Sequence, residues 1–206
     1  QYTYNGVPYL FTANEGDSRE YAGFNEMRRV GSSSHILDPT AFPNAATLKT
    51  DAQLGRLNVT TTLGDTDGDG DFDAIYSLGS RSFSVWNAVT GEQVYDSKNE
   101  LDRKALALQV YDDGRSDDKA VEPEAIAIGR VGSKQIAIVG LERADAFAIY
   151  DITNPTSPQF IKMYKTGDAP EGVLFIPASK SPIQQSLIVV SSENDGVIKI
   201  YKANKI

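Results

Sequence analysis

The chain has 206 residues, of which 40% are hydrophobic and 23% are charged, a composition that is ordinary for a globular protein and excludes wholesale disorder. Its formal net charge of −8 repels phosphate backbones and argues against a nucleic-acid partner. No apolar run approaches the roughly 18 residues that a transmembrane segment needs. Cysteine is absent and His35 is the single histidine, so thiolate chemistry and multi-histidine metal sites are excluded.

The N-terminal part of the chain shows little regular pattern beyond two predicted strands. Alternating apolar residues predict one strand over residues 7–13 and another over residues 56–63. Between them, residues 22–55 are rich in turn-forming residues and predict an irregular insertion with one short helix. His35 lies there in a serine-rich segment, where we expect a structural or solvent-facing histidine.

Three later segments share one pattern: a strand, a tight polar turn and a second strand that ends in an aromatic residue. These hairpins are predicted over residues 74–86, 136–150 and 187–201. The shared pattern indicates an internal repeat, because each segment has the same order of apolar strand, polar turn and aromatic end.

Further predicted strands flank these hairpins. Strands that begin with Pro-Glu precede two of them, over residues 123–128 and 170–175, and fourth strands are predicted over residues 93–96 and 160–163. A four-stranded unit that repeats every 40 to 50 residues or so is typical of β-propeller blades. The predicted fold class is therefore all-β, a β-propeller portion of about three to four four-stranded blades. A β-sandwich with similar hairpins is the alternative.

The number of predicted blades bears on what the chain needs as a partner. A propeller requires roughly four to eight blades to close, and an open arc leaves strand edges exposed. The strand over residues 7–13 resembles a second blade strand and is expected to need a neighbour before it, and the hairpin over residues 187–201 needs one after it. We therefore expect residues 1–206 to be the C-terminal half of one propeller domain, completed by a second polypeptide from the same precursor or from another chain. A homodimer of half-propellers is the less favoured arrangement.

The most specific motif is an acidic loop that fits D-x-D-x-D-G-x-x-D. Calcium prefers six to eight oxygen ligands, and Gly70 permits the sharp turn that such a loop needs. The predicted Ca²⁺ ligands are the side chains of Asp65, Asp67, Asp69 and Asp73 and the carbonyl of Asp71. Tyr76 stands where an EF-hand has glutamate, and predicted strands flank the loop, so the motif is not an EF-hand. A solvated acidic turn is the alternative.

Other acidic residues follow the predicted strands and are expected on one rim of the propeller. They are Glu15, Asp17, Glu122, Glu124, Glu142, Glu171, Glu193 and Asp195. We expect most of them to cap turns or to pair with Arg19, Arg81 and Arg143, and a second metal or catalytic cluster is the alternative. The acidic segment 112–119 is predicted to be a solvated loop, and Asn58 begins a glycosylation sequon.

Several of these motifs together resemble the choice-of-anchor I domain family. The motifs that carry the resemblance are residues 9–21, 54–60, 79–86, 115–119, 122–124, 140–143 and 170–172. The family includes bacterial secreted proteins and mesenchyme-specific cell-surface glycoproteins of biomineralising animal cells. The resemblance implies a propeller of about twice this length, expected to have seven blades, and a location that is extracellular, secreted or anchored at the cell surface.

The predicted function follows from this resemblance and from the acidic loop. We expect a non-catalytic, calcium-binding propeller that acts in adhesion or associates with matrix, glycan or mineral. Because some family members carry an alkaline-phosphatase label, the alternative is a calcium-dependent phosphoesterase similar to propeller phytases. No catalytic residue is predicted, since no nucleophile–base pair is recognisable.

Overall fold

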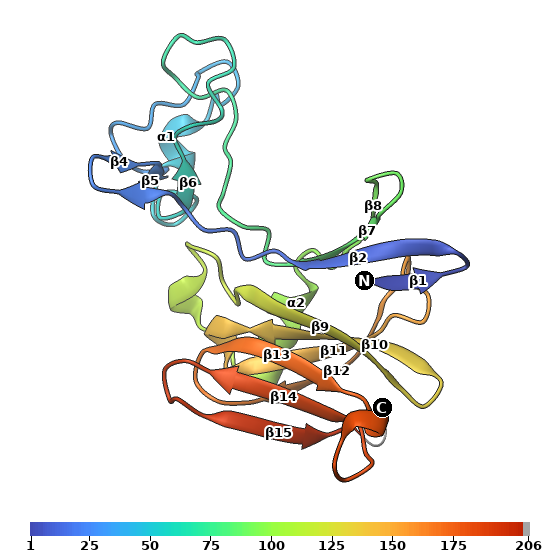
Figure 1. Ribbon diagram of the computed structural model, residues 1–206. Helices are drawn as coiled ribbons and strands as arrows, with labels where there is room; N and C mark the ends of the chain where they lie inside the picture. The colour runs from blue at the N-terminus through green and yellow to red at the C-terminus, as the bar shows by residue number, and fades with distance from the viewer. Residues whose placement is uncertain (204–206) are drawn as a thin grey trace. The chain divides into compact units, whose positions relative to one another are not determined.

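The computed structural model describes residues 1–203 and shows a chain that is nearly all β and propeller-like (Figure 1). The chain divides into two compact units. The sheet unit contains Gln1–Glu15, Arg81–Asp112 and the chain from Ala120 onward, and the loop unit contains Gly16–Ser80 with Asp113–Lys119.

The first sheet of the sheet unit has the strand order β1-β2-β7-β8. Its strands are β1 (Tyr2–Tyr4), β2 (Val7–Ala13), β7 (Phe83–Asn87) and β8 (Gln93–Asp96). A two-residue turn at Asn5 and Gly6, both with positive φ, joins β1 to β2. The strand over residues 7–13 therefore has its preceding neighbour, β1, within the chain. The expectation that this neighbour is missing was wrong.

The hairpin predicted over residues 74–86 is also wrong in its first half. Strand β7 pairs with β2, in the register Leu10 with Trp86, and Gly16–Ser80, the larger segment of the loop unit, lies between these two strands in the sequence. Residues 74–78 form no strand; Ile75 instead packs on the small core of the loop unit, and Ser77 makes an isolated bridge to Val59.

The second and third sheets follow in chain order as antiparallel meanders, with strand orders β12-β11-β10-β9 and β13-β14-β15. The second sheet contains β9 (Pro123–Val131), β10 (Lys134–Leu141), β11 (Ala146–Asp151) and β12 (Gln159–Lys165). The third sheet contains β13 (Pro170–Ile176), β14 (Leu187–Ser192) and β15 (Ile198–Lys202). The hairpins predicted over 136–150 and 187–201 and the fourth strands predicted at 93–96 and 160–163 are confirmed.

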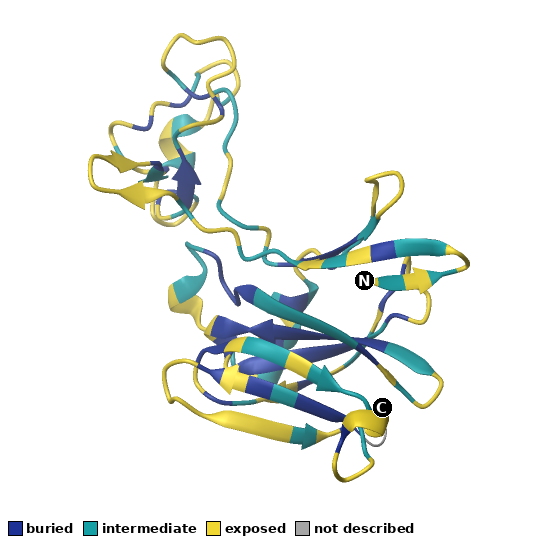
Figure 2. Ribbon diagram, in the orientation of Figure 1, coloured by how far each residue is buried: buried dark blue, intermediate teal, exposed yellow. Residues whose placement is uncertain are grey.

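The middle sheet is buried on both faces because its strands alternate between two cores (Figure 2). Ala137 and Val139 face a core shared with Phe83 of the first sheet. Ile136 and Ile138 face the opposite core, shared with Ile188 of the third sheet. Three sheets stacked face to face in chain order are the arrangement of propeller blades, whereas a β-sandwich has two sheets.

Short helices and strands complete the two units. In the sheet unit, α2 (Glu100–Leu108) buries Leu101 and Ala105, and η2 (Glu142–Ala144) and η3 (Ala178–Lys180) follow strands. In the loop unit, the remaining elements are β3 (Glu20–Tyr21), β4 (Phe24–Asn25), β5 (Met27–Arg29), α1 (Ala45–Leu48), β6 (Asn58–Thr60) and η1 (Asp113–Arg115). The loop unit has a small buried core of Val30, Leu37, Val59 and Phe72.

Candidate metal centre

The acidic loop of residues 65–73 lies in the loop unit and wraps its own backbone around its first aspartate. The Gly68 N–H donates to Asp65 Oδ1 at 2.7 Å, and the Gly70 N–H donates to Asp65 Oδ2 at 3.1 Å. Both glycines have positive φ, 82° and 98°, a conformation that favours glycine. The loop is thus turned tightly around the Asp65 carboxylate.

Asp73 closes the loop from its other end. Its Oδ2 accepts hydrogen bonds from the backbone N–H of Thr66 at 2.8 Å and from Thr66 Oγ1 at 2.7 Å. These bonds stabilise the ionised form and hold the pKa of the Asp73 carboxyl below its usual range. The backbone N–H of Asp73 donates to the carbonyl of Gly64 at 2.8 Å, so the two ends of the loop are tied together.

The structure brings three of the predicted ligands together and adds one that the sequence did not indicate. Carboxylate oxygens of Asp65, Asp67 and Asp73 lie within 4.8 Å of one another. Oxygens of Asp38, Asp71 and Asp73 form a second such group, so Asp73 belongs to both. The pKa of the Asp71 carboxyl is raised, first by burial and then by the charges of Asp69 and Asp38.

Asp38 reaches the loop because a parallel bridge joins Leu37 to Phe72. The Asp38 N–H donates to the Phe72 carbonyl at 3.0 Å, and the Phe72 N–H donates to the Ile36 carbonyl at 2.9 Å. The side chain of Asp69 accepts the Asp71 N–H at 3.0 Å and belongs to neither carboxylate group. No feature of the sequence near Asp38 signals this contact, because the bridge joins segments far apart in the chain.

A second carboxylate cluster lies in the sheet unit, at the ends of strands. Glu124 lies in β9, Glu142 begins η2 directly after β10, and Glu171 lies in β13. One oxygen of each lies within 4.8 Å of the others. Of the acids predicted on the rim, these three therefore do converge.

The electrostatics of this cluster favour protonated carboxyls. Burial, partly offset by the neighbouring Arg143 guanidinium, raises the pKa of Glu142 to about 7. Burial and the charges of Glu171 and Glu15 raise the pKa of Glu124. A hydrogen bond with Glu193 raises the pKa of Glu171.

Ion pairs and turn caps account for other acids of the predicted rim, as expected. Arg143 lies 2.9 Å from Glu142 and 3.5 Å from Glu122. Asp195 accepts the Asp168 and Val197 N–H groups at 3.0 and 3.1 Å. Arg143 and Glu142 also line an open, polar cavity of about 460 Å³ within the sheet unit.

Arg19 and Arg81 pair with acids outside the predicted rim. Arg19 Nη2 lies 2.6 Å from Glu26 in the loop unit. Arg81 Nη1 lies 3.8 Å from Asp102 of α2 in the sheet unit. These two arginines therefore have structural partners within their own units.

The remaining sequence candidates are structural. His35 is 1% exposed and stacks on Phe72 with ring centroids 4.1 Å apart, and burial lowers its pKa. Asn58, which begins the sequon, is buried in β6, and its Nδ2 donates to Asp118 Oδ1 at 3.4 Å. In the segment predicted as a solvated loop, Arg115 pairs with Asp118 at 3.0 Å.

Comparison with known proteins assigns the chain to a family. The model of the choice-of-anchor I domain matches residues 1–155. The chain belongs to the choice-of-anchor I domain family. Gigasin-3a of Magallana gigas is 31% identical over 185 residues, and the match covers 73% of the chain and 65% of that relative. The chain thus spans less than two thirds of the length of this curated relative, and no solved structure matches it.

Membership of the choice-of-anchor I domain family indicates a surface or extracellular protein. In the part of the chain that the structure describes, no helix has the length and apolar character needed to cross a membrane.

Proposed function

We propose that this chain is a calcium-binding part of a secreted or surface-anchored β-propeller protein that acts without catalysis, in adhesion or in association with matrix or mineral. The observation that carries the proposal is the convergence of carboxylates at the 65–73 loop. Asp73 belongs both to the cluster with Asp65 and Asp67 and to the cluster with Asp38 and Asp71. Family membership supports the surface location.

The chemistry of the loop favours calcium over other cations. Its ligands are all oxygen atoms, which hard cations prefer, and the carboxylates and carbonyls of the loop can supply more than six of them. Magnesium demands near-ideal octahedral geometry and retains its water, whereas calcium tolerates irregular sets of carboxylates and carbonyls at about 2.3–2.6 Å. Hydrogen bonds to Asp65 and Asp73 already hold these two carboxylates in place, so cation binding requires little reordering of the backbone.

Isothermal titration calorimetry of the chelator-treated chain tests the calcium site. We expect one strong site for Ca²⁺, much weaker binding of Mg²⁺, and loss of the site in Asp67→Asn. Asp51→Asn is the matched control, because Asp51 is an exposed aspartate of the same unit that lies outside the loop. Equal calcium binding by the wild type and by Asp67→Asn would contradict the proposal.

The proposed association with mineral or matrix has its own test. The net charge of −8 suits adsorption to calcium-bearing surfaces. We expect the chain to sediment with calcium carbonate or calcium phosphate particles at physiological salt, and not with silica of equal surface area. Equal adsorption to silica would show that the interaction is not specific to calcium minerals.

The second candidate function is calcium-dependent phosphoester hydrolysis. It is favoured by the cluster of Glu124, Glu142 and Glu171 with Arg143 beside it, because clustered cations and a guanidinium can together bind phosphate. Hydrolysis of p-nitrophenyl phosphate or phytate in calcium, abolished by Glu142→Gln, would establish it. The leading proposal expects no turnover of either substrate.

A further inference from the structure

The polar cavity of about 460 Å³ in the sheet unit is formed by three segments that are distant in the sequence. They are residues 109–112 after α2, the turn 142–145 between β10 and β11, and residues 168–169 before β13. Small-molecule sites in proteins have volumes of about 300–1,000 Å³. The cavity therefore has the size of a ligand site.

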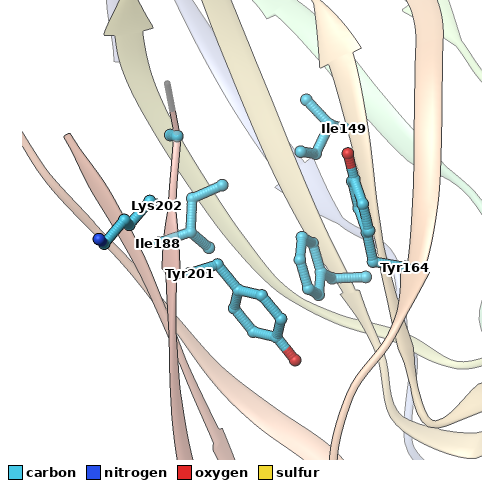
Figure 3. Close-up of a pocket in the computed structure, with 7 residues that line it drawn as sticks. Ile149, Tyr164, Ile188, Tyr201 and Lys202 are labelled. Atoms are coloured by element: carbon cyan, nitrogen blue, oxygen red, sulfur yellow. The ribbon is translucent and has the colours of Figure 1, made fainter. Parts of the chain in front are cut away.

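The lining of this cavity differs from that of a smaller one between the second and third sheets. The smaller cavity measures about 140 Å³, and Figure 3 shows Ile149, Ile188 and the rings of Tyr164 and Tyr201 around it. These largely apolar walls offer few hydrogen bonds to replace those that a hydrophilic molecule makes with water. Polar side chains line the larger cavity, which therefore suits a hydrophilic ligand.

The walls of the larger cavity carry both hydrogen-bond acceptors and donors. Arg143 contributes a guanidinium, which only donates, and Gln109 contributes an amide, which does both. Ionised carboxylates only accept hydrogen bonds. Four of the lining residues are of this kind: Asp112, Glu142, Asp145 and Asp168.

Hydrogen bonds within the chain hold two of these carboxylates in place. Asp145 Oδ1 accepts the Ala169 N–H at 3.0 Å, and Asp168 Oδ1 accepts Asn194 Nδ2 at 3.1 Å. A carboxylate can accept about four hydrogen bonds. Both side chains are therefore positioned by the fold and still have the capacity to accept from a ligand.

The backbone around the cavity has an uncommon conformation at three points. Gln109, Asp145 and Ala169 have φ of 60°, 48° and 53°, in the left-handed region that non-glycine residues rarely adopt. Thr166 N–H donates to the Asp145 carbonyl at 2.7 Å, and Glu193 N–H donates to the Ala169 carbonyl at 2.8 Å. Such conformations persist where the surrounding structure enforces them, and they concentrate at ligand sites. The shape of the cavity is thus fixed by the chain itself.

We propose that this cavity binds a neutral mono- or disaccharide. Each saccharide hydroxyl both donates and accepts, so it matches walls that combine carboxylates with a guanidinium and an amide. An anionic ligand would lie among four carboxylates, and a compact cation would be repelled by Arg143 and leave most of the volume unfilled. This site goes beyond the proposed calcium site, which lies in the other unit.

NMR spectroscopy of the isotope-labelled whole chain tests the proposal. The neutral probes are maltose, cellobiose, lactose and sucrose, with spermidine as the cationic comparison and inorganic phosphate as the anionic one. The titrations are run in EGTA, so that calcium plays no part. We expect at least one saccharide to bind saturably at about 10 mM or below. Its binding should shift the amide signals of residues 109–112, 142–145 and 168–169 and should not weaken with added salt.

Two variants test the residues that line the cavity. Gln109→Gly removes the amide without backbone strain, because glycine readily adopts positive φ. Asp145→Asn keeps an oxygen for the Ala169 N–H and replaces the other carboxylate oxygen with a donor. Each should weaken saccharide binding about three- to tenfold, the effect of one lost hydrogen bond. Gln184→Gly is the matched control and should bind as the wild type, because Gln184 is exposed with φ of 56° in the same unit but lies outside the cavity.

Four results would overturn the proposal. They are no saturable binding of any of the saccharides, tighter binding of spermidine or phosphate than of every saccharide, amide shifts confined to residues outside the cavity, or equal saccharide affinity in the wild type and both cavity variants. Asp67→Asn, which removes the proposed calcium site, should bind saccharide as the wild type does. A failure of the saccharide site is therefore distinguished from a failure of the calcium site.

Discussion

Removal of calcium should lower the melting temperature of the loop unit by more than ten degrees and leave the sheet unit unchanged. A ligand that binds only the folded state stabilises it by RT ln(1 + [L]/Kd), about 2.7 kcal/mol at a hundredfold excess over Kd. In a domain of this size, 1 kcal/mol shifts the melting temperature by about 4–8 °C, so we expect a shift of about 11–22 °C. The effect is large because the hydrophobic core of the loop unit has only four buried apolar residues.

Two probes separate the units during melting. Scanning calorimetry with calcium or with EGTA reports both transitions, and the fluorescence of Trp86, the single tryptophan, reports the sheet unit. The wild type in EGTA should match Asp67→Asn, which should no longer respond to calcium, while Asp51→Asn should behave as the wild type. An unchanged calorimetric midpoint in EGTA, or an equal shift in Trp86 fluorescence, would refute the reasoning.

Three further predictions concern single side chains. The folded-state pKa of Glu142 lies near 7, above its ordinary value of 4.5, so its contribution to stability is present at low pH and lost as the pH rises through 7. The urea midpoint of Glu142→Gln relative to that of the wild type should therefore rise from pH 5 to pH 8. An equal difference in midpoint at both pH values would contradict this prediction. The lowered pKa of His35 has the opposite effect: stability is lost as the pH falls below about 6.5, and His35→Phe should remove that loss in thermal melts. Phe83 is fully buried, and its ring centroid lies 4.7 Å from that of Tyr150. Phe83→Ala should lower the free energy of unfolding in urea by about 3–5 kcal/mol, and a loss below about 1 kcal/mol would show that the core is not packed as described.

The sequence predicted the strands that pair with their neighbours in the chain and failed where pairing is distant. The hairpins at 136–150 and 187–201 combine alternating apolar residues with a short turn, so local pattern determines both strands and their partner. The segment 74–86 has a similar pattern, yet β7 pairs with β2 across the intervening segment Gly16–Ser80 of the loop unit. Apolar alternation marks a strand and its buried face, but it does not identify the partner when a long insertion intervenes.

In the candidate site, too, the sequence predicts what is local in the chain and misses contacts between distant segments. The spacing of Asp65, Asp67 and Asp73 is local, and the structure brings their carboxylates together. Asp38 joins through the bridge between Leu37 and Phe72, which no local pattern reveals. The convergence of Glu124 and Glu171 was foreseeable because both follow a proline at equivalent strand starts, but the raised pKa of Glu142 depends on burial that only the folded chain shows.

Anomalous diffraction from crystals grown in calcium tests the central claim most directly, because it locates the ion. We predict one strong peak in the 65–73 loop, about 2.3–2.6 Å from carboxylate oxygens of Asp65, Asp67 and Asp73. A loop without a peak, in crystals whose calcium lies instead among Glu124, Glu142 and Glu171, would contradict the account.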